Sequence, residues 1–141
     1  MSENLNDPVE SLDEATCWEL LRTASLGRIA VSFQGEPEIY PINFIAVDGR
    51  LLIRTTQGTK LLKLTINEKV ALETDSVGQH TAWSVIVKGT ARVVESQDEI
   101  FEAEQLPLHP LIPTIKYVWV EVTPTEVSGR RFELGPEPER Y

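Results

Sequence analysis

Hydrophobic residues recur at two different spacings along the chain, and the change between them separates an opening helix from a series of strands. Ala15, Trp18 and Leu21 recur at helical spacing. The preceding Ser11-Leu12-Asp13-Glu14 matches a capping box, which is a signature of a helix start. The pattern predicts a helix over residues 13 to 24.

Beyond residue 28 the spacing becomes two, which is typical of strands with one buried face. Ile29, Val31 and Phe33 fall on one face of the first predicted strand. Gln34-Gly35 and Asp48-Gly49 are turn signals, so the first three strands should run antiparallel. The strands predicted after the first cover residues 36–47, 50–55, 69–74, 82–95, 117–122 and 126–132.

Prolines and glycines mark where these strands should be irregular. Pro37 and Pro41 cannot donate ladder hydrogen bonds, so the second strand should lie at an edge or carry a bulge near Tyr40-Pro41. Gly89 indicates a bulge or the close approach of another backbone. Thr123-Pro124-Thr125 predicts a turn between the last two strands.

Further helices are predicted between the strands. Leu61, Leu62 and Leu64 supply the apolar face of a short helix after the third strand, and residues 97–105 predict an acidic helix. Residues 106–113 are apolar but rich in proline, so this stretch should pack across a surface or a partner chain. Six or seven mostly antiparallel strands with short helices between them predict an α+β fold in which β structure dominates, a small barrel closed to remove its edges.

Length and charge narrow the class of protein. A chain of 141 residues is long enough for one domain with a real core. We assign residues 1–10 to a flexible N-terminal arm, 11–134 to the domain and 135–141 to a flexible acidic tail. The formal net charge of -9, from 13 basic and 22 acidic residues, argues against a nucleic-acid partner because a phosphate backbone would be repelled.

Cysteine usage and hydropathy bear on the compartment. Cys17 is the single cysteine, which rules out an intramolecular disulfide and fits a reducing compartment, so we expect a cytoplasmic location. Its place beside Trp18 within the predicted helix favours a small core residue over a nucleophile. No apolar run is long enough to span a bilayer, and no signal peptide is recognisable, so no membrane partner is expected.

The stretch from Arg54 to Leu64 joins a predicted strand to a predicted helix through residues suited to binding an anion. Unpaired N–H groups and the positive end of the helix dipole favour an anion at a helix N-terminus. Arg54, Lys60 and the threonines between them would add charge-assisted hydrogen bonds to a phosphate. In the alternative interpretation, Thr56 or Thr59 only caps the helix and the two cations are solvated.

Three more residues are candidates for contacts with a planar ligand. The amide of Asn43 can both donate and accept, as the edge of a flavin or a pyrimidine requires, although it could equally tie down an irregular backbone. Trp83 could wall the ligand and Ser84 could reach its polar rim, but a tryptophan is more common in a core or a subunit interface. His80 and His109 each lack a second candidate ligand, so no metal site is predicted.

Familiar catalytic motifs are missing from the sequence. It contains no Gly-x-Gly-x-x-Gly, and Gly58-Thr59-Lys60 lacks the spaced glycine of a Walker loop. Neither a nucleophile elbow nor a pair of carboxylates at an identifiable catalytic spacing is present. Demanding chemistry would therefore have to come from a bound cofactor.

Four motifs stand in order along the chain: Leu26-Gly27-Arg28-Ile29-Ala30-Val31-Ser32, Tyr40-Pro41-Ile42-Asn43-Phe44, Arg54-Thr55-Thr56-x-Gly58-Thr59-Lys60-Leu61 and Trp83-Ser84-Val85-Ile86-Val87-Lys88-Gly89. In this combination, spread over residues 12 to 132, the chain resembles the pyridoxamine 5'-phosphate oxidase-like family of flavin-binding split barrels. The resemblance implies a six-stranded split barrel, a homodimer and two FMN sites at the subunit interface.

Carried over by position, the resemblance also implies roles for single residues. Arg54 and Lys60 would hold the FMN phosphate, with nearby threonines assisting. Asn43 would lie along the isoalloxazine, and Trp83 and Ser84 would line the site. The full set of cofactor-binding residues implied in this way is Asn43, Arg54, Thr55, Thr56, Thr59, Lys60, Trp83 and Ser84.

The function implied by the resemblance is that of an FMN-dependent oxidoreductase with a small-molecule redox substrate. The vitamin oxidase itself continues into a C-terminal segment whose arginines and aromatic residue help to bind pyridoxal phosphate, whereas this chain ends with Ser128-Gly129-Arg130-Arg131-Phe132 and an acidic tail. We therefore do not expect vitamin B6 oxidation. Short relatives use FMN or the deazaflavin F420, or bind haem, so the alternative is a dimeric carrier or sensor of flavin, F420 or haem that performs no catalysis.

Overall fold

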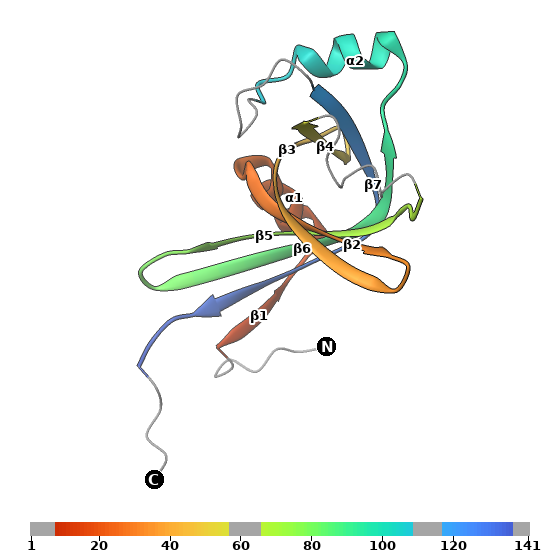
Figure 1. The fold of residues 1–141 in the computed structure, drawn as a ribbon. Coiled ribbons are helices and arrows are strands. Elements are labelled where there is room, and N and C mark those ends of the chain that lie inside the picture. Colours follow the sequence, from red (N-terminus) through yellow and green to blue (C-terminus); the bar gives the residue numbers. More distant parts are fainter. Residues whose placement is uncertain (1–7, 57–65, 109–116, 137–141) are drawn as a thin grey trace.

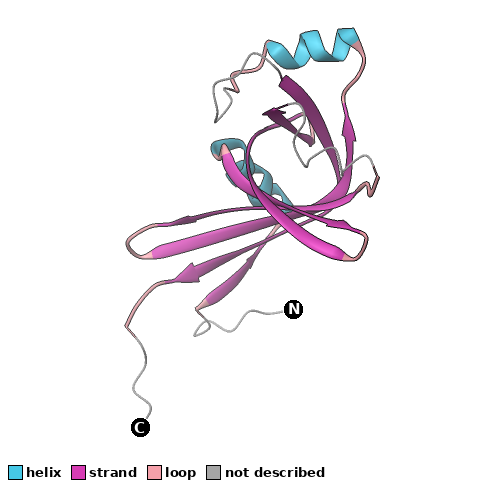
Figure 2. Ribbon diagram, in the orientation of Figure 1, coloured by secondary structure: helices cyan, strands magenta, loops and turns pink. Residues whose placement is uncertain are grey.

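Seven strands and two helices make up the part of the chain that the computed structural model describes, residues 8–56, 66–108 and 117–136 (Figures 1 and 2). The elements in chain order are β1 (Val9–Leu12), α1 (Glu14–Thr23), β2 (Leu26–Phe33), β3 (Glu36–Val47), β4 (Arg50–Thr56), β5 (Lys69–Val77), β6 (Thr81–Val93), α2 (Gln97–Glu104) and β7 (Tyr117–Glu133). The predicted β-dominated fold class is confirmed. The short helix predicted after the third strand lies outside the described residues.

All seven strands belong to one antiparallel sheet whose ends meet. The strand order is β1-β7-β4-β3-β2-β5-β6, and β7 pairs additionally with β6. This last pairing closes a ring of six strands, β7-β4-β3-β2-β5-β6, and leaves β1 as an extra strand beside β7. Figure 1 shows the strands curling around a common interior. The predicted six-stranded barrel is therefore present, and closure leaves few free edges.

The start of the chain differs from the prediction. β1 pairs with residues 129–132 of β7, and its first two residues, Val9 and Glu10, fall in the segment that we assigned to a flexible arm. Ser11 therefore lies in a strand and does not cap the helix. Asp13 is the cap instead, because its carboxylate accepts a hydrogen bond from the Thr16 N–H at 2.8 Å. This hydrogen bond lowers the pKa of Asp13.

Two tight turns make β2, β3 and β4 a continuous meander, as predicted. The residues at both turns have positive φ, with Gln34 at 51° and Asp48 at 52°, each followed by a glycine. The β2–β3 register is unbroken from Leu26 opposite Asn43 to Phe33 opposite Glu36, so the bulge considered near Tyr40-Pro41 is absent. β4 pairs only with residues 44–47 of β3, so the proline-containing half of β3 is an edge on that side.

The turn predicted at Thr123-Pro124-Thr125 is absent, because β7 runs through these residues as one strand. The irregularity is a bulge. Lys88 pairs with Glu126 and Gly89 pairs with Pro124, which leaves Thr125 as the extra residue. A Cβ atom on Gly89 would lie 2.2 Å from the Thr123 carbonyl oxygen, so this close approach requires glycine. The irregularity predicted at Gly89 is confirmed.

Strand alternation divides the apolar residues between two clusters. The main core fills the ring and includes Phe44, Ile29 and Leu72, with Cys17 of α1 buried among them as predicted. A second cluster lies on the outer face of β4 and β7 and is covered by α2 and the residues that follow it. Its buried members are Leu52, Val94, Ala103, Leu108 and Trp119. This outer cluster positions the candidate site.

Candidate functional site

Arg54 lies on the outer face of the barrel because side chains alternate along β4. Ile53 enters the main core, whereas Leu52 and Arg54 point to the outer cluster. Trp119 is directly opposite Arg54 in the β4–β7 ladder, and the guanidinium carbon is 5.4 Å from the centroid of the tryptophan ring. Arg54 Nη1 also donates a hydrogen bond to the Leu108 carbonyl oxygen at 3.2 Å. The arginine is thus held by two different elements.

The chemistry around Arg54 suits an anionic ligand. A cation over an aromatic face gains about 0.5 to 2 kcal/mol, which orders the guanidinium without neutralising it. Arginine carries five N–H donors, and one of those of Arg54 is bonded to the Leu108 carbonyl oxygen. The ring nitrogen of Trp119 is a further buried donor, and it has no hydrogen-bond partner within the described ranges. Both side chains therefore carry donors and no acceptor.

Asn43 shares this outer face with Arg54. Phe44 and Ile53 are paired across β3 and β4, and both enter the main core. The residue before Phe44 and the residue after Ile53 therefore turn outward on adjacent strands. Asn43 is 8% exposed, which places its amide at a mostly buried part of that face. The fold thus brings together two of the residues proposed from the sequence, Asn43 and Arg54.

Of the other residues predicted to bind the phosphate, the structure describes only those on β4. Thr55 follows Arg54 on β4 and pairs with Val118, so its side chain takes the opposite face and is half-buried. Thr56 ends β4 opposite the first residue of β7. Thr59 and Lys60 lie outside the described residues.

Trp83 and Ser84 do not lie near Arg54 within one chain. They pair with Arg131 and Arg130 of β7, whereas Arg54 pairs with Trp119 at the other end of the same strand. Positions 119 and 131 are twelve residues apart, or about 40 Å along a strand. Trp83 is half-buried and packs against the main core. A ligand that touched both groups would therefore need these two residues from a second copy of the chain.

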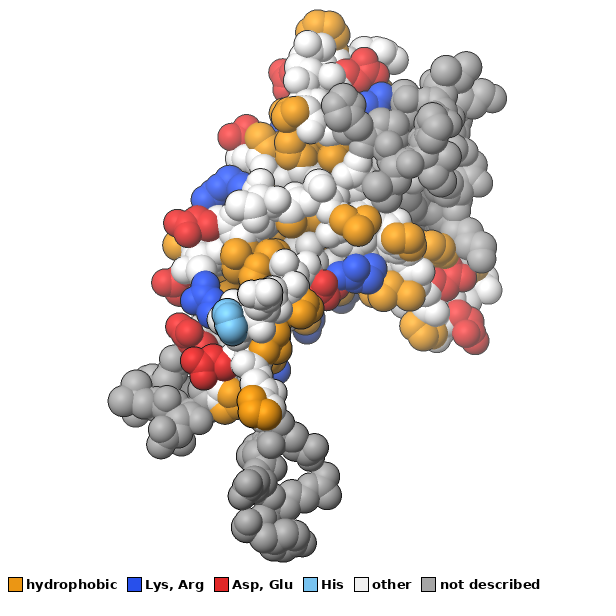
Figure 3. Space-filling model, turned by 90° about the vertical axis from the view of Figure 1, so that its left-hand side faces the viewer, with side chains coloured by type: hydrophobic (Ala, Val, Ile, Leu, Met, Phe, Trp, Pro, Cys, Tyr) orange, Lys and Arg blue, Asp and Glu red, His pale blue; other side chains and the backbone are white. Residues whose placement is uncertain are grey.

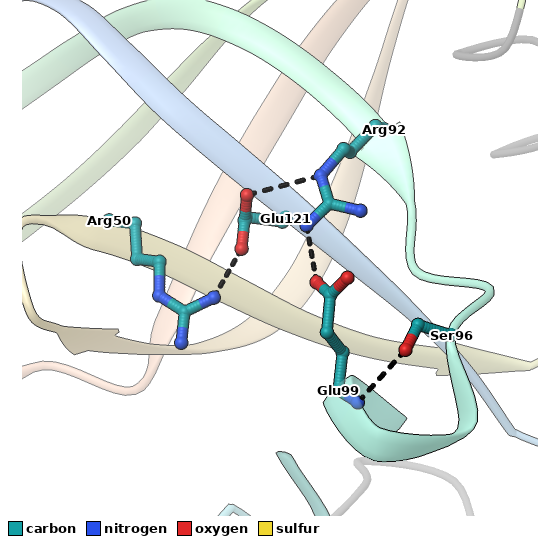
Figure 4. Close-up of polar contacts among 5 residues, drawn as sticks. All are labelled: Arg50, Arg92, Ser96, Glu99 and Glu121. Carbon is teal, nitrogen blue, oxygen red and sulfur yellow. Dashed lines mark hydrogen bonds and ion pairs between the residues drawn. The ribbon is translucent and has the colours of Figure 1, made fainter. Parts of the chain in front are cut away.

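An ion-pair network beside the outer cluster was not foreseen from the sequence (Figure 4). Glu121 on β7 accepts hydrogen bonds from Arg50 on β4 and from Arg92 on β6. Arg92 also donates to Glu99 of α2, and the Glu99 N–H donates to the Ser96 hydroxyl that caps this helix. Arg50 and Arg92 are 71 and 29 residues from Glu121 in sequence, so no local pattern could have indicated the network.

The network also sets the charge state of Glu121. This residue is only 8% exposed, and burial acts to raise the pKa of its carboxyl group. Hydrogen bonds from Arg50 and Arg92 outweigh that cost and hold the pKa of Glu121 below its ordinary value. A carboxylate taken out of water in this way needs both partners, because an unpaired buried charge is strongly unfavourable.

Two hollows on the described surface have lining residues that include neither Arg54 nor Asn43. One of about 140 Å³ lies between α2 and the β3–β4 turn. The other, of about 530 Å³, lies where β2 and β5 part, with Lys69 and Lys88 among its lining residues. Across the same residues, no three His, Cys, Asp or Glu side chains gather closely enough to hold a metal ion. Neither described helix has the length and apolar character to cross a bilayer.

Comparison with known proteins identifies the relatives of this chain. Residues 13–131 match the sequence model of the pyridoxamine 5'-phosphate oxidase family. A Corynebacterium glutamicum structure, provisionally named as such an oxidase, is 41% identical, with a TM-score of 0.84 over 94% of this chain and 100% of that one. An FAD binding protein from Mycobacterium smegmatis is 40% identical, with a TM-score of 0.76 over 88% and 98%. An uncharacterized Mycobacterium tuberculosis protein is 42% identical over 67% of this chain and 86% of its own length.

Glu121→Gln should lower the free energy of unfolding at neutral pH by about 2 kcal/mol, because two hydrogen bonds to a charged group are weakened. A carboxyl group whose folded pKa is depressed stabilises the protein above its unfolded pKa, and this contribution is lost as the pH falls through the folded pKa. The stabilities of wild type and variant should therefore converge as the pH falls below the ordinary value of 4.5. Urea unfolding across this pH range measures the difference.

The matched control is Glu126→Gln, which removes a carboxylate whose pair with Lys88 spans 3.8 Å and is well exposed. Its effect on stability should be under about 0.5 kcal/mol. A stability gap between wild type and Glu121→Gln that stays constant into acid would contradict the role given to Glu121.

Proposed function

The chain belongs to the pyridoxamine 5'-phosphate oxidase family, and on that basis we propose that it binds a flavin nucleotide whose phosphate is held by Arg54. The observation that carries the proposal is the position of this arginine. It stands on the outer face near the end of β4, stacked on Trp119 and bonded to the Leu108 carbonyl, and its guanidinium carries the positive charge and planar N–H donors that suit a phosphate. Asn43 lies on the same outer face of the adjacent strand, and its amide has both the donor and the acceptor that the isoalloxazine edge requires.

Among flavins we propose FMN as the cofactor. A terminal phosphate can accept from Arg54 and from the basic and hydroxyl residues that follow β4 in sequence, Thr59 and Lys60 among them. The same phosphate occurs within FAD, and the Mycobacterium smegmatis relative is an FAD binding protein. The site proposed here therefore accounts for either nucleotide, and a direct comparison of FMN, FAD and F420 decides between them.

The reaction we propose is a flavin-dependent oxidation or reduction of a small molecule. The bound flavin would supply the hydride chemistry, and the protein would supply binding, orientation and polarity. Arg54 would fix the phosphate end, and Asn43 would orient the ring by its amide. Trp119 would keep water from one side of the guanidinium, which strengthens the hydrogen bonds of Arg54.

A second candidate function is that of a carrier or sensor that binds the cofactor and does not turn over. One observation favours it. Arg54 contacts the Trp119 ring and the Leu108 carbonyl, and neither group is a general acid or base at neutral pH. Proton transfer would have to come from another segment, from a second protomer or from the substrate itself.

We further propose that two copies of the chain form a homodimer with the cofactor at their interface. Trp83 and Ser84 would then approach Arg54 from the opposite protomer, since they lie far from it within one chain. Large hydrophobic side chains reach solvent on the outer face of the sheet, where Ile86 is 40% exposed and Ile39 is 65% exposed. Figure 3 shows hydrophobic side chains at the surface among charged ones. Such exposure is typical of an interaction surface.

The first prediction concerns cofactor binding. Arg54→Ala should weaken FMN binding by about 2 to 3 kcal/mol, because a charge-assisted hydrogen bond is lost at a partly buried site. Lys60→Ala should weaken it as well. Titration of the flavin-free protein with FMN, followed by flavin fluorescence, gives both dissociation constants, and parallel titrations with riboflavin, FAD and F420 test the need for the phosphate and the choice of flavin.

Arg22→Ala is the matched control, since it removes an exposed arginine in the last turn of α1. It should leave FMN affinity unchanged. Wild-type affinity in both Arg54→Ala and Lys60→Ala would defeat the phosphate assignment, and failure of the wild type to bind any of these flavins would defeat the proposed function.

Turnover separates the enzyme from the carrier. If the protein is an oxidoreductase, anaerobic addition of NADH or NADPH should bleach the flavin absorption band at about 450 nm. An added acceptor should restore the band, and the cycle should be repeatable. Stopped-flow absorbance measures both half-reactions. Two results together would favour the carrier. The bound flavin would stay oxidised with both nicotinamides, and the bound reduced flavin would react with each acceptor no faster than free reduced FMN does.

The dimer has its own test. The wild type should sediment as a dimer at micromolar concentration, and Ile86→Glu should shift it towards the monomer by placing a charge in an apolar contact. Phe101→Glu is the control, because Phe101 is a large and 66% exposed apolar residue that lies on α2 and not on β6. Analytical ultracentrifugation measures the masses. A wild type that is monomeric with FMN bound would contradict the shared site.

A further inference from the structure

We propose that the ion pairs of Glu121, Arg92 and Glu99 position Arg54 for the cofactor phosphate by fixing α2 and, with it, the Leu108 carbonyl. This inference rests on the proposed function, because it explains how the arginine assigned to the phosphate is held ready. Glu121, Arg92 and Glu99 are positioning residues in this scheme. None of them is expected to touch the cofactor.

The first step links Arg54 to the end of α2. Arg54 Nη1 donates to the Leu108 carbonyl oxygen, and the Leu108 side chain is 3% exposed within the outer cluster. Leu108 N donates to the Leu106 carbonyl at 2.8 Å, and Leu106 N donates to the Ala103 carbonyl at 3.0 Å. These short-range bonds tie Leu108 to the last turn of the helix. A shift of α2 would therefore move the acceptor that Arg54 uses.

The second step concerns how weakly α2 is held by apolar contacts alone. Its eight residues bury only Ala103 fully, with Ile100 partly buried, while Phe101 is 66% exposed. A helix this short is not stable without tertiary contacts. Burial of one alanine and part of one isoleucine provides few of them. Within the helix itself, apolar contacts with the barrel are therefore few, and a polar attachment would add to those of Leu106 and Leu108 that follow it.

The ion pairs provide that attachment. Glu99 lies in the first turn of α2 and accepts from Arg92 of β6. Arg92 is in turn oriented by Glu121, whose other carboxylate oxygen accepts from Arg50 of β4 (Figure 4). Because the hydrogen bond to Glu121 already orders the Arg92 side chain, Arg92 loses less conformational entropy when it also binds Glu99. Three strands, β4, β6 and β7, and one helix are thereby held in one relative position.

The third step is geometric. Trp119, which stacks under Arg54, and Glu121, which anchors the network, are two residues apart on β7 and so lie on the same face. The cation–π contact and the ion-pair network are therefore built on one short piece of strand. Arg54 contacts Trp119 of β7 and the Leu108 carbonyl in the segment that follows α2, and α2 is in turn linked to Glu121 of β7 through Arg92.

A double-mutant cycle tests the inference. Glu99→Gln should weaken FMN binding about threefold to tenfold, in the range of couplings within one polar network. In an Arg54→Ala background the same substitution should have no further effect, because the group that it positions is gone. Glu121→Gln should follow the same pattern. FMN titration gives the four dissociation constants of each cycle, and thermal melts confirm that each variant is folded at the temperature used.

Glu126→Gln is the control, since it breaks an exposed ion pair away from α2 and should leave FMN affinity unchanged in both backgrounds. Rescue is a second readout. Glu99→Asp keeps the charge and should restore part of the affinity that Glu99→Gln loses, which a purely structural loss of helix packing would not predict.

The possible outcomes separate the two proposals. Wild-type affinity in Glu99→Gln and Glu121→Gln, or losses that simply add to that of Arg54→Ala, would overturn the positioning role while leaving the flavin site intact. Unchanged affinity in Arg54→Ala would remove the role of Arg54 at the phosphate and the positioning role together. A non-additive cycle with rescue by Glu99→Asp supports both.

Discussion

The structure depends on β7, because this one strand closes the barrel and carries both Trp119, which stacks on Arg54, and Glu121, which anchors the ion-pair network. Its seventeen residues pair with β4, β6 and β1, so the ring exists only while β7 is in register with two neighbours at once. Val120 and Val122 point into the main core, and Trp119 and Glu121 point outward. The alternation of side chains along β7 therefore determines both which residues pack in the core and which lie on the outer face. A slip of one residue would exchange the two sets of side chains.

The outer face of the barrel combines buried apolar side chains with an ion-pair network around the buried Glu121. Trp119 and Leu108 are almost fully buried there, while Glu121 is 8% exposed and keeps its negative charge through two arginines. A barrel of this size could have covered the face with apolar residues alone, and replacements of that kind are often neutral or stabilising. The ion pairs instead fix both the distance and the orientation of α2 relative to the barrel. Hydrogen-bonded ion pairs have a preferred geometry, which apolar packing supplies less sharply.

Elements set by local signals were predicted well, and those set by long-range pairing were not. β3 begins and ends at the predicted residues because turn chemistry at both ends is encoded in neighbouring pairs of residues. β1 was missed because four residues with no strong pattern become a strand only by pairing with the far end of the chain. The ladder bulge opposite Gly89 was foreseen from that glycine, but the continuity of β7 through Pro124 was not. Proline is tolerated there because the bulge releases the ladder at that point.

The candidate site shows the same division at the level of single residues. Arg54 and Thr55 were grouped because they are adjacent in sequence, but adjacent residues of a strand face opposite sides, and Thr55 takes the face opposite to Arg54. Asn43 and Arg54 are eleven positions apart and share a face because the β3–β4 turn fixes their register. A sequence thus identifies residue types that suit a ligand, whereas the register of the strands determines which of these residues lie close enough together to bind it. For this chain the register selects Asn43, Arg54 and Trp119, and the last of these had been assigned only to a strand.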